Sequence, residues 1–285
     1  MPWHFENAIE PIGTITEGPV WDGSAIIFTN IANSRILRYC PTTRDLTVLR
    51  SHTFECNGLA LDGDKKLYGC EGGAAGRRVV RYNEDGSTDV VASQYEGKHL
   101  NSPNDLIVDR SGRVWFTDPR YGDYRSDMEL GHESVYRCDP QPDGSWTINR
   151  MTYDTSCPNG LVLSPDETTL YVAESKYGEG ENRELRAYPV LEEGTLGSYR
   201  VLHNFYPHRG IDGMRVDAAG NIIATAGWSE TGPGPMIYVF APSGRVLATH
   251  PLPEDRPTNC CFGDLDLHGF YVTTIGGHLL CARLK

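Results

Sequence analysis

The chain has 285 residues, of which 39% are hydrophobic, and it contains 31 glycines and 18 prolines. Its formal net charge of -12 at pH 7 argues against nucleic acid as a partner, because phosphate binding needs clustered Lys and Arg. No stretch approaches the roughly 18 apolar residues that a membrane helix needs, so we expect no membrane partner. The eight cysteines have no close spacing, and the N-terminus has no signal-peptide pattern. We therefore expect reduced thiols and a cytoplasmic location.

One sequence frame recurs six times, every 40 to 55 residues. Each copy has a polar leading residue, an apolar strand, a turn residue five positions after the leading residue, and a second apolar strand. In the third copy these are Asn104, residues 106–108, Asp109 and residues 114–116. The six leading residues are Glu17, Asn57, Asn104, Asn159, Asp212 and Asn259. Self-similarity at this period, with short strands and Asp/Gly turns, is typical of a propeller.

Further apolar runs supply the remaining strands of each copy. Third runs lie at 36–39, 79–82, 135–138, 185–188, 237–240 and 279–283, and fourth runs at 47–49, 89–91, 146–148, 200–202 and 245–247. The sixth copy has no fourth run, whereas residues 5–15 are strand-like and precede the first copy. We expect this N-terminal strand to join the last blade, which would leave no open sheet edge. The prediction is an all-β fold, a six-bladed β-propeller, with residues 1–285 as a single domain.

Three connections are longer than a turn needs. They lie at 118–133, 174–182 and 227–235, between second and third strands. On a propeller they fall on the same face as the leading residues. Loops of this length are usually functional or mobile, and their roles stay open here.

The leading residues indicate a binding site because equivalent positions of successive blades converge on the central axis. Glu17 and Asp212 are carboxylates and the other four are carboxamides. A ring of oxygen ligands without His or Cys suits a hard cation such as Ca²⁺ or Mg²⁺. Asn57 and Asn259 could instead fix local turns. The Asp residues five positions on repeat as turn residues, and we assign them no chemistry.

Five motifs resemble the gluconolactonase and regucalcin (senescence marker protein) family over essentially the whole chain. They are Glu-Gly-Pro-Val-Trp at 17–21, Asn-Ser-Pro-Asn-Asp-Leu at 101–106, Phe-Thr-Asp-Pro-Arg-Tyr-Gly at 116–122, Cys-Pro-Asn-Gly-Leu at 157–161 and Gly-Ile-Asp-Gly-Met at 210–214. The resemblance implies a six-bladed propeller that binds one divalent metal ion. Carried over residue by residue, the family's metal ligands fall on Glu17, Asn159 and Asp212, with Asn104 as a ligand or near-ligand that also meets the substrate.

The activity that this resemblance implies is hydrolysis of a small-molecule sugar lactone such as gluconolactone. A cation would polarise the lactone carbonyl, and a carboxylate near it would take a proton from water. We assign that base role to Asp212. Ca²⁺ is the first choice of metal, with Mg²⁺, Mn²⁺ and Zn²⁺ as alternatives.

Substrate contacts are expected from residues near the leading residues and on the long connections. The family often places a basic residue before the Asn-Asp pair, where this chain has His99 and Asn101. The substrate-binding candidates are Asn104, Asn101, His99 and Tyr121. Ser102 lies beside His99 and Asn101. Tyr121, Asp118, Glu133 and His208 lie on loops expected to reach the same face, where each could equally be loop surface.

Two other functions remain open from the sequence. The same metal site could polarise P=O, giving hydrolysis of a phosphotriester or another ester, because fold does not fix function. The chain could also be a non-catalytic calcium-binding propeller, although the mixed Glu/Asn/Asn/Asp ring favours catalysis. We expect a monomer or a weak homo-oligomer.

Overall fold

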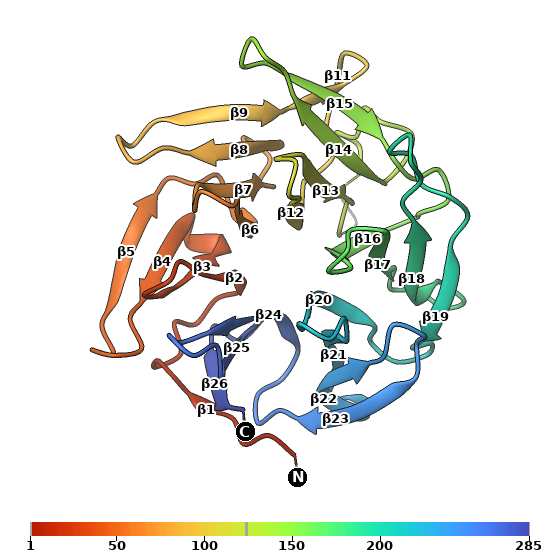
Figure 1. Ribbon diagram of the computed structural model, residues 1–285. Helices are drawn as coiled ribbons and strands as arrows, with labels where there is room; N and C mark the ends of the chain where they lie inside the picture. The colour runs from red at the N-terminus through yellow and green to blue at the C-terminus, as the bar shows by residue number, and fades with distance from the viewer. Residues whose placement is uncertain (1, 123–124, 285) are drawn as a thin grey trace.

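The computed structural model describes residues 2–122 and 125–284, which form six four-stranded antiparallel sheets arranged radially around one axis (Figure 1). Five of the sheets run outward from the axis in chain order, from β2 to β5 in the first blade for example, and the sixth runs from β24 to β26 and ends on the N-terminal β1. The predicted six-bladed β-propeller is therefore confirmed. Within the described ranges no helix is long and apolar enough to cross a membrane.

The blades are built from short strands. The innermost strands are β2 (Thr16–Trp21), β6 (Cys56–Leu61), β12 (Leu106–Val108), β16 (Pro158–Leu163), β20 (Ile211–Val216) and β24 (Pro257–Gly263). The second strands are β3 (Ile26–Asn30), β7 (Leu67–Glu71), β13 (Val114–Asp118), β17 (Thr169–Ser175), β21 (Ile222–Trp228) and β25 (Gly269–Thr274). The third strands are β4 (Arg35–Tyr39), β8 (Arg78–Tyr82), β14 (Ser134–Pro140), β18 (Arg183–Pro189), β22 (Thr231–Phe240) and β26 (Leu279–Arg283). The outer strands are β5 (Leu46–Ser51), β9 (Thr88–Ala92), β15 (Trp146–Arg150), β19 (Arg200–Asn204), β23 (Val246–Pro251) and β1 (Glu6–Asn7). Outside the blades lie the hairpin β10 (Gln94–Tyr95) with β11 (Lys98–His99) and a 3₁₀ turn, η1 (Ile31–Asn33).

The N-terminal strand closes the ring, as predicted, but it is shorter than residues 5–15. β1 pairs with β26 only at Glu6 and Asn7. Backbone hydrogen bonds continue from Ala8 to Leu279 at 2.8 Å and from Ile12 to Gly277 at 3.0 Å. Pro11 has no N–H to donate, so regular pairing cannot continue through it.

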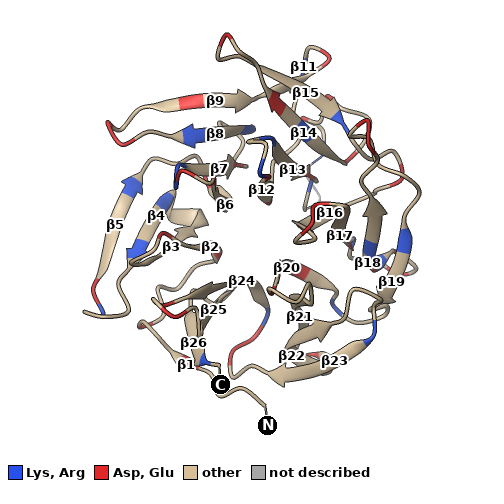
Figure 2. Ribbon diagram, viewed as in Figure 1, with Lys and Arg blue, Asp and Glu red and all other residues tan. Residues whose placement is uncertain are grey.

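The hydrophobic core lies between the blades as well as within them. One cluster joins Tyr68 and Val79 of the second blade to Phe116 and Tyr136 of the third. Both faces of the second strands are covered, and every position of β3, β7, β13 and β25 is buried. Figure 2 shows Lys and Arg mainly on middle and outer strands such as β4, β5, β8, β18 and β19, whereas β20 carries an acidic position beside the axis.

The segment at 227–235 is not the loop that we expected. β21 and β22 continue through most of it and pair Trp228 with Thr231. Gly227 has φ +88°, and a Cβ there would lie 1.9 Å from the carbonyl oxygen of Gly234. The Gly and Pro residues that permit this close pairing provide no apolar alternation, so the sequence pattern could not indicate a strand.

Candidate functional site

A repeated β-bulge lies where the leading residues enter the inner strands. The pairing of inner and second strands shifts between Glu17 and Val20, and equivalent shifts occur in β6, β16, β20 and β24. A bulge breaks the regular alternation of side chains and can re-aim one of them. In the third blade the N–H of Asn104 instead donates to the carbonyl of Thr117 at 2.9 Å, just before β12 begins.

Glycines that follow leading residues let neighbouring inner strands touch. A Cβ at Gly160 would lie 2.3 Å from the carbonyl oxygen of Asp212, and one at Gly213 would lie 2.1 Å from Cγ of Asn259. A Cβ at Gly58 would lie 2.6 Å from Oδ1 of Asp105. The ring of leading residues can be this tight only because these positions have no side chain.

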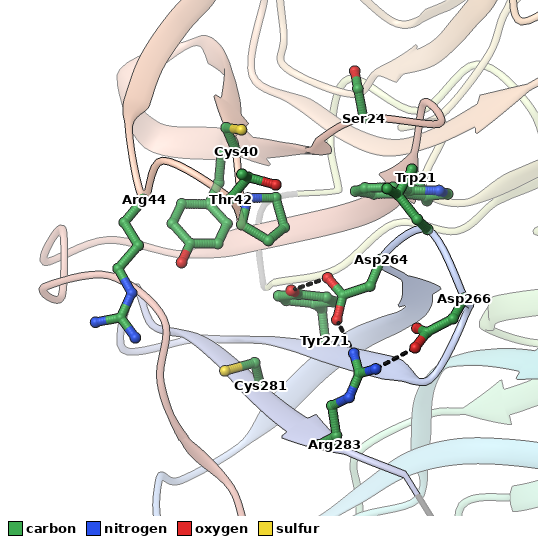
Figure 3. A pocket seen from close by; sticks show the side chains of 13 residues that line it. Trp21, Ser24, Cys40, Thr42, Arg44, Asp264, Asp266, Tyr271, Cys281 and Arg283 are labelled. Atoms are coloured by element: carbon green, nitrogen blue, oxygen red, sulfur yellow. Dashed lines mark hydrogen bonds and ion pairs between the residues drawn. The ribbon is translucent and has the colours of Figure 1, made fainter.

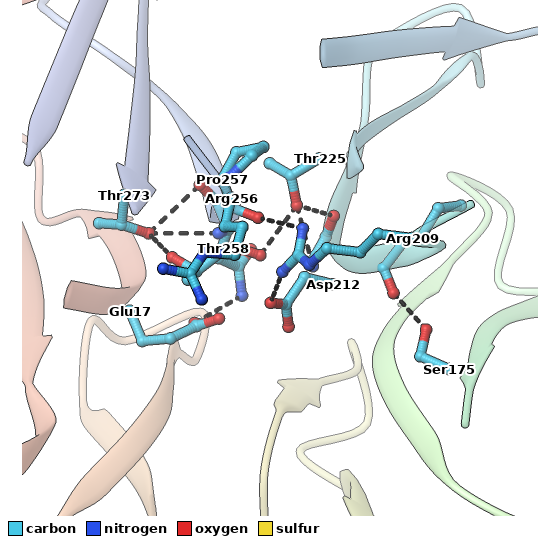
Figure 4. A network of polar contacts seen from close by, with 12 residues as sticks. Glu17, Ser175, Arg209, Asp212, Thr225, Arg256, Pro257, Thr258 and Thr273 are labelled. Carbon is cyan, nitrogen blue, oxygen red and sulfur yellow. Dashed lines mark hydrogen bonds and ion pairs between the residues drawn. The ribbon is translucent and has the colours of Figure 1, made fainter. Parts of the chain in front are cut away.

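Threonines on the second strands hold the bulges in place (Figure 4). Thr225 Oγ1 donates to the carbonyl of Thr258 at 2.8 Å and accepts from the N–H of Gly213 at 3.1 Å. The N–H of Asn259 likewise donates to Oγ1 of Thr273 at 3.2 Å. Buried backbone groups that the bulges leave outside the regular ladder thus find partners within or across blades.

Three carboxyl groups lie close enough to influence one another at the axis: those of the buried Glu17 and Asp105 and of the partly exposed Asp212. Nδ2 of Asn259 donates to Oε2 of Glu17 at 3.1 Å and to Oδ2 of Asp105 at 3.3 Å. Burial raises the pKa of Glu17 well above its usual range, and the charges of Asp212 and Asp105 raise it further. Burial also raises the pKa of Asp105, although the Arg215 guanidinium opposes that shift. Asp105 was missed from the sequence, where only its neighbour Asn104 occupies the repeating position.

Asp212 has a positively charged partner, Arg209, which the sequence did not indicate. Nη2 of Arg209 donates to Oδ2 of Asp212 at 2.5 Å. The Arg209 side chain is only 7% exposed, and its Nη1 donates to the carbonyls of Pro257 at 3.0 Å and Gly227 at 3.3 Å (Figure 4). Burial raises the pKa of Asp212, while Arg209 and a hydrogen bond from Asn159 lower it. The signal was the Arg-x-x-Asp spacing, which occurs in only one copy of the frame.

The donor set fits a hard divalent cation. No three acidic, histidine or cysteine side chains of residues 2–122 and 125–284 gather as a metal site by themselves, and a cation held here would also need carboxamide oxygens. Glu17 and Asp212 supply mutually repelling carboxylates, Asn159 interacts with Asp212, and Asn104 is buried at the equivalent position of the third blade. In addition, Oδ1 of Asn57 is buried and has no hydrogen-bond partner among the described residues.

The hydrogen bonds of Asn259 give it a different role from the other leading residues. Its amide nitrogen is committed to Glu17 and Asp105, and its Oδ1 accepts from the N–H of Cys260 at 2.9 Å. We assign it to positioning the two carboxylates. Neither a local turn alone nor metal ligation describes these contacts.

The four predicted substrate contacts are not all brought together. Asn104 is buried in the ring, whereas His99 is exposed on β11 at the outer edge of the molecule (Figure 1). Asn101 is buried; its N–H donates to Oδ2 of Asp118 at 2.8 Å, and its Oδ1 has no partner in the described part of the chain. Tyr121 exposes 37% of its surface, yet burial raises the pKa of its phenol, with Cys157 and Asp212 adding to the rise. The structure thus places Tyr121 near Asp212 and turns His99 away.

The remaining candidates have structural partners. Asp118 accepts from the N–H groups of Asn101 and Ser102, both at 2.8 Å, and burial raises its pKa to about 7. Glu133 accepts from the N–H of Arg120 at 2.6 Å. The carbonyl of His208 accepts from Arg183 at 3.1 Å. These contacts hold the connections in shape.

Two hollows lie away from the ring. One of 670 Å³ lies at the seam of the first and last blades, where Arg283 is paired with Asp264 at 3.0 Å and with Asp266 (Figure 3). Another, of 330 Å³, is lined by the far ends of inner strands and is apolar apart from Arg215. Both lie toward the hairpin turns that follow the inner strands. The leading residues are at the opposite ends of those strands.

Comparisons with known proteins agree with this architecture. Residues 15–276 match the family described as SMP-30/Gluconolactonase/LRE-like region. A gluconolactonase of Zymomonas mobilis subsp. mobilis is 32% identical over 276 residues, covering 87% of this chain and 73% of that protein. The pentonolactonase XacC of Haloferax volcanii is 30% identical over 267 residues, covering 92% and 81%. A solved gluconolactonase structure from Xanthomonas campestris has a TM-score of 0.83 and 33% identity, covering 99% of this chain and 90% of that one. The chain therefore belongs to the SMP-30/gluconolactonase/LRE-like family.

Proposed function

We propose that the protein is a lactonase that opens a sugar lactone at the ring of leading residues, with one divalent cation as cofactor. The observation that carries this proposal is the convergence of Glu17, Asn159 and Asp212 from separate blades on one buried, acidic, oxygen-rich site. The gluconolactonase and pentonolactonase relatives support the reaction class. Ca²⁺ is the first choice of ion because the donors are carboxylate and carboxamide oxygens, with Mg²⁺, Mn²⁺ and Zn²⁺ as alternatives.

Each residue has a definite role in the proposal. Glu17, Asn159 and Asp212 would hold the cation, with Asn104 beside them. When bound, the cation supplies Lewis-acid polarisation of the lactone carbonyl. Asn104, Asn101 and Tyr121 offer hydrogen-bonding groups to the sugar hydroxyls.

Asp212 is the proposed base that takes a proton from the attacking water. Burial favours the protonated carboxyl, while Arg209 and Asn159 favour the carboxylate. Arg209 is a positioning residue for Asp212, because it fixes Oδ2 and leaves Oδ1 for other contacts. If Asp212 is the base, Asp212→Asn with its metal site saturated should lose at least about 100-fold in kcat. Wild-type turnover in that variant would reject the base role.

The function is tested by following acid release from glucono-1,5-lactone with a pH indicator. The protein is first treated with a chelator, and Ca²⁺, Mg²⁺, Mn²⁺ or Zn²⁺ is then returned singly. We expect the rate to fall to that of spontaneous hydrolysis after chelation and to recover with at least one ion. A rate equal to the spontaneous one under all conditions, across a panel of sugar lactones, would favour a non-catalytic calcium-binding propeller. Hydrolysis of a phosphotriester or simple ester in preference to lactones would favour the other alternative.

We further propose that residues 1–285 act as one domain in the cytoplasm, as a monomer or weak homo-oligomer. The location is supported by all eight cysteines being free thiols, six of them buried. Size-exclusion chromatography with light scattering would measure the oligomeric state.

A further inference from the structure

An exposed strip of three tyrosines and one arginine leads outward from the ring of leading residues. The ring centroids of Tyr121 and Tyr177 are 6.5 Å apart. Cζ of Arg183 lies 5.8 Å from the centroid of Tyr177 and 5.5 Å from that of Tyr206. The tyrosines expose 37%, 48% and 44% of their surface, in that order along the strip. Isolated exposed aromatics are common, but a connected row that starts at a proposed active site is not explained by core packing.

The inner end of the strip is attached to the ring. The Tyr121 phenol lies close enough to the Cys157 thiol, two residues before Asn159, for each to raise or lower the pKa of the other. The charges of Asp212 and Arg209 both act on the Tyr177 phenol. A molecule that reaches Asp212 would therefore also meet Tyr121 and Tyr177.

The outer end of the strip is held in place by backbone contacts. The Arg183 guanidinium donates to the carbonyls of Gly178 and His208, each at 3.1 Å, and of Pro207. The hydroxyl of Tyr206 accepts from the N–H of Gly180 at 3.3 Å. No ion pair involves Arg183 in the part of the chain that the structure describes, so its planar group is fixed between two rings without a carboxylate. Such a surface loses little conformational entropy on binding a ligand.

We propose that this strip is a subsite for a second sugar ring, so that the substrate class includes lactones of disaccharide aldonic acids. The inference rests on the proposed lactonase function and extends it. The faces of tyrosine rings offer apolar area to the C–H faces of a pyranose, and hydroxyl and guanidinium groups donate to sugar hydroxyls. A monosaccharide lactone held at Asp212 would use the inner end of the strip. The outer end, Arg183 and Tyr206, would contact the substrate only if the substrate has a second sugar ring.

The test compares glucono-1,5-lactone with cellobiono-1,5-lactone as substrates of the metal-loaded protein. For each we measure kcat/KM and take the ratio of the disaccharide lactone to the monosaccharide lactone. We expect this ratio to exceed about five in the wild type and to fall at least about fivefold in Tyr206→Ala, because a stacking face is lost. Tyr206→Phe keeps the ring and should keep the ratio. The matched control is Tyr153→Ala, which removes a 74%-exposed tyrosine that also lies under an arginine, Arg150, but is not in the strip.

The outcomes separate this inference from the function on which it rests. Hydrolysis of gluconolactone with a ratio near one, or with a ratio that Tyr206→Ala does not change, overturns the subsite and leaves the lactonase proposal standing. Absence of hydrolysis of both lactones overturns the lactonase proposal and the subsite with it. If Tyr206→Ala melts well below the wild type, Arg183→Ala, the other outer-end variant, takes its place, and the same fall in the ratio is required of it.

Discussion

At the scale of single residues, the Asp212 carboxylate is the proposed partner of two positive charges, the Arg209 guanidinium and the cation. Arg209 donates to its Oδ2. The remaining oxygen of Asp212, together with Glu17 and Asn159, would hold the proposed cation. A fixed guanidinium beside a divalent cation repels it. Arg209 would therefore lower the affinity for the proposed ion while it holds Asp212 in one orientation.

Arg209→Gln should separate these two effects. We expect the dissociation constant for Ca²⁺ to fall at least about tenfold, because a like charge near the ion is removed. The kcat for gluconolactone should fall, because Asp212 loses its fixed partner. Isothermal titration and steady-state kinetics measure the two quantities. Arg209→Lys, which keeps the charge, is the control and should not tighten Ca²⁺ binding. Weaker Ca²⁺ binding in Arg209→Gln would contradict this view of the ion pair.

Some residues of the site could be predicted from the sequence and others could not. Glu17, Asn104, Asn159 and Asp212 occupy repeating positions, so the frame could point to them. Asp105 does not repeat, and the Arg209 position is matched only by Arg256 in the last copy, so the frame does not point to either residue. His99 is two residues from Asn101, yet the β10–β11 hairpin turns it to the outside. Proximity in sequence could not indicate that turn.

At the scale of elements, the inner strands approach one another through glycine. Gly213→Ala would drive a methyl group into the Asn259 side chain, whose Cγ is 2.1 Å from the Cβ position. We expect a loss of about 1–3 kcal/mol of stability and weaker metal binding, because Asn259 positions Glu17 and Asp105. Gly63→Ala is the matched control, since a Cβ there has no atom within 4 Å. Equal denaturant midpoints and equal Ca²⁺ affinities for the two variants would show that the close approach is not needed.

The N-terminal segment is the second element with a measurable role. Removing residues 1–14 takes away β1, the buried side chains of Phe5 and Ile9, and Trp3, which stacks on His250 at 3.9 Å. Burying two large apolar side chains is worth about 3–6 kcal/mol, so we expect the melting temperature to fall by about 10 °C or more. An unchanged thermal melt would mean that the segment does not close the last blade.

Element positions could be predicted where apolar runs alternate with Asp/Gly turns, and this applies to most blade strands. The exceptions have physical reasons. The closing strand ends at Asn7, and Pro11 beyond it has no N–H to donate, while the Gly/Pro-rich start of β22 (Thr231–Phe240) pairs without any apolar alternation. Backbone geometry determines where these two segments pair, and the pattern of apolar and polar side chains does not indicate it.

At the scale of the whole molecule, the propeller gathers carboxyl groups of separate blades in a buried ring, and this has a pH consequence. Glu17, Asp105 and Asp212 all have pKa values raised first by burial. A carboxyl group with a raised pKa in the folded state contributes stability below its unfolded pKa near 4. That contribution is lost as the pH rises through the folded pKa. A cation that binds the deprotonated carboxylates would offset this loss of stability.

We therefore expect the rise in melting temperature caused by saturating Ca²⁺ to be larger at pH 8 than at pH 5. His132, His203 and His250 have pKa values lowered by burial, so they change stability in the opposite direction. These histidines affect the melting temperature equally with and without Ca²⁺. The difference between the two melting temperatures at one pH therefore reports the contribution of the acidic ring. The measurement is thermal unfolding in metal-free and Ca²⁺-containing buffer at each pH. A Ca²⁺-dependent rise that is equal at both pH values, or larger at pH 5, would contradict the acidic ring.

The most direct test of the central claim is calorimetric titration of Ca²⁺ into metal-free wild-type, Glu17→Gln, Asp212→Asn and Asp217→Asn proteins. Asp217 is the control, since it is the turn carboxylate of the same frame as Asp212 and accepts from the N–H of Ala219 at 2.9 Å. We predict one ion per wild-type chain and per Asp217→Asn chain, and at least about 100-fold weaker binding in the other two variants. No binding to the wild type, or wild-type affinity in both Glu17→Gln and Asp212→Asn, would contradict the claim that these side chains share one cation.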